Sequence, residues 1–170
     1  MKLNKFSKLA EFLSVAIISS SLLTTGCSRF NNQPEEKTVE DKSKEEDSLI
    51  ANMDSATVFE RCKLYYSSEN YNDAFKYCKK SAEEGISDAQ FTLGVMYCGG
   101  QGVKQDYFKA FEWYQKAAEQ GIAQAQYSLG IMYYDGKGVR QNYTKAKEYF
   151  GLACDNKYQD GCDIYKKLNQ

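Results

Sequence analysis

A repeat of 36 residues constrains the fold of this chain more than any other feature. Residues 89–121, AQFTLGVMYCGGQGVKQDYFKAFEWYQKAAEQG, align without gaps with residues 125–157, AQYSLGIMYYDGKGVRQNYTKAKEYFGLACDNK. This offset brings identical residues together: Leu93 and Leu129, Gly94 and Gly130, Tyr97 and Tyr133, Gly102 and Gly138, Val103 and Val139, Tyr107 and Tyr143, Ala110 and Ala146. A period of this length is typical of helical-hairpin solenoids.

Each copy has the pattern of two helices joined by a glycine-rich corner. In the first, large apolar residues recur at helical spacing up to Tyr97, and the glycines of CGGQGV then end the helix. Asp106, or Asn142 in the second copy, precedes the next helix as an N-cap. Gly94 and Ala110 are small, which predicts that the two helices approach closely there.

These residues resemble Sel1-like repeats, a subclass of the tetratricopeptide family, whose pattern is LGxMYxxGxGVxxxYxKAxxxYxxAA. A degenerate earlier unit, ATVFERCKLYYSSENYNDAFKYCKKSAEEGISDAQ, lacks the GxGV corner and is four residues shorter there. The resemblance implies an all-α fold, a short right-handed αα-hairpin solenoid of about three hairpins with a C-terminal capping helix. We expect a degenerate tetratricopeptide-like repeat at 51–86, Sel1-like repeats at 87–122 and 123–158, and the capping helix at 159–170.

The N-terminus has the pattern of an export signal. Three lysines precede the mostly apolar run of residues 12–23, which is too short and too rich in serine for a membrane span. The LTTGC ending resembles the lipobox of bacterial lipoproteins, although Thr24 stands where leucine is usual. The resemblance implies a lipoprotein signal peptide at 1–26, lipidation of Cys27 and an anchor in the bacterial envelope, in the outer membrane or facing the periplasm. The alternative is a periplasmic or secreted protein without lipid.

Residues 27–50 are expected to form a lipidated cysteine followed by a disordered acidic tether. The stretch SRFNNQPEEKTVEDKSKEEDS has almost no large apolar side chains. It therefore cannot bury enough surface to offset the conformational entropy lost on folding.

Five cysteines remain after Cys27, in a compartment where disulfides persist. By the repeat register, Cys154 ends one helix and Cys162 lies one turn into the next, so both thiols meet at a helix–turn–helix corner. Cysteine-rich bacterial Sel1-repeat proteins share this AC…GC pairing, which the resemblance therefore supports. Cys62 is expected to pair with Cys78. Cys98 is left as a candidate free thiol that could join a homodimer, or pair with Cys78 instead.

The sequence argues against catalysis. It has no histidine and no recognisable acyl-transfer or phosphate-binding motif, so we expect no catalytic residues, no metal site and no cofactor. The net charge of -1 gives no basic face for nucleic acid. Some cysteine-rich Sel1-repeat proteins are named as penicillin-binding or β-lactamase-like, so the resemblance leaves a weak hydrolase as the alternative.

By analogy with helical solenoids, we expect a non-enzymatic scaffold that binds a partner protein or peptide in a concave groove. The first helix of each unit would line this groove. The expected groove residues are Phe59, Lys63, Tyr66, Asp88, Phe91, Val95, Gln124, Tyr127, Ile131 and Tyr134, with Cys98 beside them. For Phe59, Phe91 and Tyr127 the alternative is a place in the core.

Overall fold

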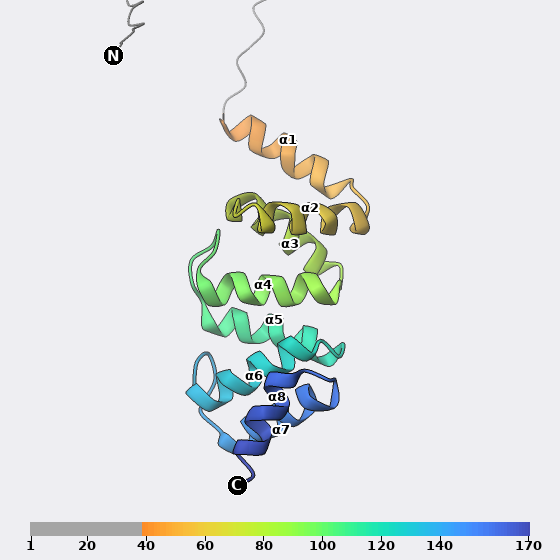
Figure 1. Ribbon diagram of the computed structural model, residues 1–170. Coiled ribbons are helices and arrows are strands. Elements are labelled where there is room, and N and C mark those ends of the chain that lie inside the picture. The colour runs from red at the N-terminus through yellow and green to blue at the C-terminus, as the bar shows by residue number, and fades with distance from the viewer. Residues whose placement is uncertain (1–38) are drawn as a thin grey trace, which may run out of the picture. The chain divides into compact units, whose positions relative to one another are not determined.

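Three consecutive helical hairpins make up most of the structure. The computed structural model describes residues 39–170, and these form eight helices (Figure 1). The helices are α1 (Val39–Ala51), α2 (Ser55–Ser67), α3 (Tyr71–Glu83), α4 (Ser87–Gly99), α5 (Tyr107–Glu119), α6 (Ala123–Asp135), α7 (Tyr143–Asp155) and α8 (Gln159–Lys167). The pairs α2–α3, α4–α5 and α6–α7 pack as hairpins, and α8 packs on α7. The fold is therefore the expected all-helical solenoid of paired helices.

The helix ends follow from local sequence. Asp106 caps α5 by accepting hydrogen bonds from the backbone amides of Phe108 and Lys109, each at 3.1 Å. Asn142 caps α7 in the same way through the amide of Lys145, at 3.0 Å. Such caps satisfy amide groups that have no partner inside the first turn of a helix. At the other end, α4 and α6 each stop at a glycine in the left-handed conformation.

Close approach of the two helices in a hairpin depends on glycine. A Cβ atom added at Gly94 would lie 2.6 Å from the ring of Tyr114, and one added at Gly130 would lie 2.7 Å from the ring of Phe150. No side chain fits in either gap without moving the ring. The aromatic ring of each second helix therefore packs directly on the backbone of the first helix, as the small residue at this position predicts.

The glycine of the GxGV corner has a separate role in stacking one hairpin on the next. Gly102 lies against the backbone of Tyr71 at the start of α3, and Gly138 lies against that of Tyr107 at the start of α5. Both glycines have positive φ, 66° and 68°. A side chain would collide with the backbone of the preceding hairpin, so this corner fixes the spacing between neighbouring hairpins.

The prediction of disorder up to residue 50 is wrong for residues 39–50, which belong to α1. Two properties explain the helix. Its sequence, VEDKSKEEDSLIA, is rich in the helix formers Glu and Lys. Its end carries Ile50, only 6% exposed, which packs into the core cluster of the first hairpin with Val58 and Tyr77. One buried apolar residue thus anchors a segment that is otherwise polar.

The signal peptide, Cys27 and residues 28–38 of the expected tether lie outside the described residues. Within residues 39–170, no helix combines the length and the apolar composition that a bilayer crossing requires.

Candidate functional site

All ten expected groove residues lie on the first helices of the three hairpins. Helix α2 carries Phe59, Lys63 and Tyr66, helix α4 carries Asp88, Phe91 and Val95, and helix α6 carries Gln124, Tyr127, Ile131 and Tyr134. We call this set the groove face. Among its apolar and aromatic side chains, exposure is greatest on α6, where Ile131 and Tyr134 are 38% and 44% exposed. The apolar side chains of α2 and α4 in this set are partly buried.

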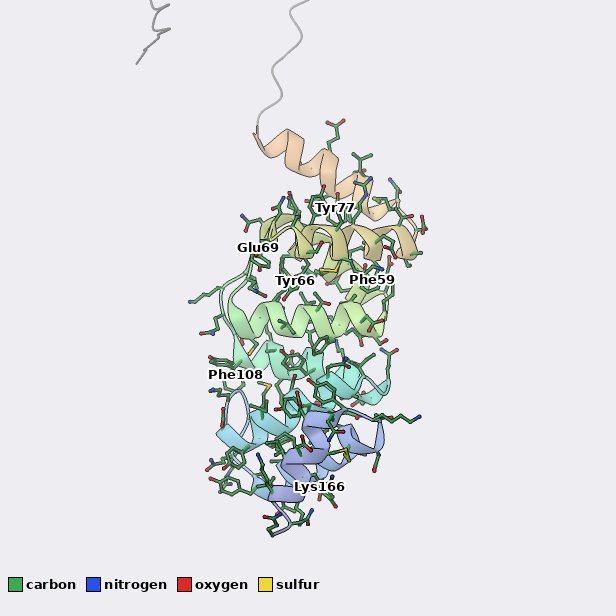
Figure 2. All side chains as sticks on the ribbon, in the orientation of Figure 1. Phe59, Tyr66, Glu69, Tyr77, Phe108 and Lys166 are labelled. Carbon is green, nitrogen blue, oxygen red and sulfur yellow. A yellow bond between two sulfur atoms is a disulfide. The ribbon has the colours of Figure 1, made fainter. Side chains whose placement is uncertain are left out.

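The α2 end of the groove face is held by internal contacts. In Figure 2, Phe59 and Tyr66 lie between α2 and α4. The hydroxyl of Tyr66 donates a hydrogen bond to Gln101 at 3.1 Å, and its ring packs edge-on against Tyr71. Burial raises the pKa of Tyr66. Lys63 pairs with Glu60 at 2.6 Å and covers the ring of Phe59. The side chains of Phe59, Lys63 and Tyr66 therefore already have partners within the protein.

Phe91 and Tyr127 also contribute to the core. Phe91 packs against Tyr114 with ring centroids 5.8 Å apart, and Tyr127 packs against Phe150 at 5.5 Å and Tyr158 at 5.2 Å. Phe91 and Tyr127 therefore belong in part to the core, and each also keeps part of its side chain exposed.

Cys98 lies in a polar cluster between α4 and α6. The hydroxyl of Tyr114, from α5, lies near the side chains of Cys98 and Ser128. Burial raises the pKa of Tyr114, the thiol of Cys98 raises it further, and contact with Ser128 lowers it. Cys98 is a free, half-buried thiol. It is therefore partly covered, and a homodimer through Cys98 remains a prediction.

The groove face opens into an apolar pocket between α6 and α8. Its volume is about 390 Å³, and it is lined by Tyr127, Ile131, Tyr134, Asp135, Phe150, Ile164, Lys167 and Leu168. Three of these are groove residues expected from the sequence. Phe150 of α7 is 2% exposed and closes the inner end, whereas Leu168 is 37% exposed. This is where the groove face offers both apolar surface and space.

The other five lining residues were not predicted from the sequence, although the repeat register contains a signal for Ile164 and Lys167. Position 164 follows Ser128 by 36 residues, and position 167 follows Ile131 by the same interval. Helix α8 is therefore the first helix of a further unit and continues the groove face. Treating it only as a cap concealed this surface.

Two disulfides join helices that the register places together. Cys62 on α2 is bonded to Cys78 on α3, and Cys154 on α7 to Cys162 on α8. These are the two pairings that the sequence favoured. Because disulfides persist in oxidising compartments, they indicate a protein that lies outside the cytoplasm.

A stack of αα-hairpins with a glycine-rich corner in each full repeat defines a class of helical repeat proteins. Models of the Sel1 repeat match residues 64–86, 87–122 and 123–158. The chain belongs to the Sel1 repeat family. No curated protein matches the chain.

Solved structures that resemble the chain include the following three. A Sel1 repeat protein from Oxalobacter formigenes is 29% identical with a TM-score of 0.63, over 74% of this chain and 98% of its own. Cysteine-rich protein B of Helicobacter pylori is 25% identical with a TM-score of 0.53, over 66% and 98%. The protective antigen c5321 of uropathogenic Escherichia coli, described as displaying an SLR fold, is 34% identical with a TM-score of 0.61, over 64% of this chain. The chain spans only 24% of the length of c5321.

Proposed function

We propose that this protein is a non-enzymatic interaction scaffold that binds a protein or peptide along its groove face. The observation that carries the proposal is the apolar pocket between α6 and α8, because it joins expected groove residues to open apolar surface. Exposed apolar surface with a hollow is the usual site of peptide and protein recognition. Tyrosine suits such a surface because its large ring is rigid and its hydroxyl can still bond to water.

The proposal includes export and a lipid anchor on Cys27, which would hold the scaffold at a membrane of the bacterial envelope. The two disulfides support export, since they belong to an oxidising compartment. The absence of histidine and of recognisable catalytic motifs supports a role in binding rather than in hydrolysis.

Selection from a displayed library of random peptides on the purified protein tests the binding role. We expect peptides whose binding falls about tenfold or more in Tyr134→Ser, since Tyr134 lines the pocket and is 44% exposed. The matched control is Phe108→Ser, which also removes an exposed aromatic, 72% exposed, but from α5 and away from the pocket. The melting temperature of both variants should stay close to that of the wild type.

A selection that yields no binding peptide would contradict the binding role. Peptides that bind both variants as well as the wild type would place binding elsewhere on the protein. Peptides lost only from Phe108→Ser would assign it to the surface at the start of α5.

A further inference from the structure

The repeat register pairs the pocket between α6 and α8 with an equivalent position between α4 and α6. Adding 36 to Cys98, Tyr114 and Ser128 gives Tyr134, Phe150 and Ile164. The two sets occupy the same places in successive repeats. Their comparison shows which changes of side chain distinguish the pocket from the equivalent site one repeat earlier.

The earlier site is polar at its centre. The buried hydroxyl of Tyr114 lies near both the thiol of Cys98 and the side chain of Ser128. The hydroxyl of Ser128 also donates a hydrogen bond to the carbonyl of Gln124 at 2.8 Å. A purely apolar side chain placed there would meet polar groups that it cannot satisfy.

At the later site two of these polar groups are gone, and the third position holds Tyr134, which is 44% exposed. Phe150 has no hydroxyl, and Ile164 replaces the serine on the facing helix. Ile131 and Leu168, 38% and 37% exposed, complete an apolar lining. The volume of about 390 Å³ is at the small end of the range for ligand pockets, about 300–1,000 Å³, and suits one or two side chains.

The two charges at the edge of the pocket differ in whether they already have an ionic partner within the described part of the chain. Two charged residues line the pocket, Asp135 and Lys167. Asp135 is already paired with Lys137 at 3.0 Å. Lys167 forms no ion pair with any residue in the described part of the chain, and Lys166 precedes it in the last turn of α8. The edge therefore offers an unpaired positive charge and favours a carboxylate on the occupant.

We propose that the pocket between α6 and α8 takes one large apolar side chain of an acidic peptide, with a carboxylate next to that side chain bound by Lys167. This proposal rests on the proposed function and names the class of partner. The apolar lining formed by Ile131, Phe150 and Ile164 favours an apolar side chain in the pocket. The positive charge of Lys167 favours a negatively charged residue next to that side chain in the peptide.

Four matched peptides test this inference by fluorescence anisotropy with the purified protein. They carry tryptophan or alanine at the anchor position and aspartate or lysine next to it. We expect the tryptophan–aspartate peptide to bind about tenfold or more tightly than each of the other three. The variant Lys167→Glu should reverse the preference in favour of the tryptophan–lysine peptide. Lys167 is exposed, so this variant should fold as the wild type does.

Two further variants test the position of the pocket. Phe150→Tyr combined with Ile164→Ser restores the tyrosine and serine of the earlier repeat and should weaken the tryptophan–aspartate peptide about tenfold or more. Tyr114→Phe changes only the equivalent ring of the earlier site and should leave this affinity unchanged. Circular dichroism spectra should show that each variant is folded.

Three results would overturn the inference. The first is equal affinity for the acidic and basic tryptophan peptides. The second is a Phe150→Tyr/Ile164→Ser variant that is folded and binds normally. The third is binding by none of the four peptides. If library peptides still depend on Tyr134 in any of these cases, the groove binds peptides of another chemistry, so only this inference fails. If the library also yields none, the proposed function fails with it.

Discussion

Lys157 occupies a backbone position at which the preceding repeats use glycine. It has φ of 64°, whereas Gly85 and Gly121, its equivalents 72 and 36 positions earlier, have φ of 92° and 88°. A residue with a Cβ atom is disfavoured in this conformation by about 1–2 kcal/mol. The turn between α7 and α8 therefore carries a local cost that the earlier turns avoid.

Replacing Lys157→Gly should raise the free energy of unfolding by about 0.5–1 kcal/mol. The gain is smaller than the full conformational cost because glycine also gives the unfolded chain more freedom. Equilibrium unfolding in urea measures the change. Lys157→Ala is the control, since it removes the charge and keeps the Cβ atom. If alanine stabilises the protein as much as glycine, then backbone strain at this turn is not the cause.

At the scale of elements, each disulfide stands where another repeat has a noncovalent contact. Cys62 and Cys78 match the positions of Gly94 and Tyr114, whose glycine–ring contact joins α4 to α5, once the shorter corner is allowed for. The second disulfide joins one hairpin to the next helix. At the two earlier junctions the side-chain amide of a glutamine reaches the carbonyl of an alanine, Gln90 to Ala82 and Gln126 to Ala118, each at 3.2 Å.

The glutamine hydrogen bond of the earlier junctions, if introduced at the junction of α7 and α8, should partly replace the stabilisation that the second disulfide gives. Cys154→Ser with Cys162→Ser should lower the free energy of unfolding by about 2–3 kcal/mol, the value expected for a short disulfide loop. Cys154→Ala with Cys162→Gln restores the residues of the earlier junctions and should recover about 1 kcal/mol of this loss through the new hydrogen bond. Unfolding in urea compares the two double variants. Equal stability of both would show that the junction of α7 and α8 does not accommodate the glutamine.

At the scale of the whole molecule, the disulfides protect the parts of the solenoid with fewest neighbours. One lies within the first hairpin and the other holds α8, while the α4–α5 hairpin is packed between two others. In a repeat protein each unit is stabilised by its neighbours, so terminal units are weakest. Placing both bonds in terminal units is consistent with a protein that folds and works in an oxidising compartment.

Intact mass spectrometry of the unreduced protein from its own cells tests this view of the molecule. We expect a mature chain that begins at Cys27 and carries lipid. Two disulfides make its mass four hydrogens lower than that of the reduced form. A single thiol, that of Cys98, should react with an alkylating agent after unfolding. A retained Met1 with free cysteines would contradict export, the lipid anchor and the oxidising compartment together, and a doubled mass that disappears on reduction would indicate the homodimer.

The sequence by itself determined the features that depend on spacing along the chain. The 36-residue register predicted the hairpins, the caps Asp106 and Asn142, and the cysteine pairs, because helical periodicity and short turns fix which residues meet nearby. The same register aligns α8 with the first helix of a repeat, since Lys167 follows Ile131 by 36 residues.

Only the tertiary structure decided the features that depend on packing. Ile50 turns part of a polar segment into α1 because it finds a buried place on the first hairpin, and composition alone cannot show that place. The pocket depends on how Phe150, Ile164 and Lys167, from two helices, lie around the side chains of α6. Its volume reflects side-chain packing in three dimensions, whereas the repeat pattern records only which helix faces which.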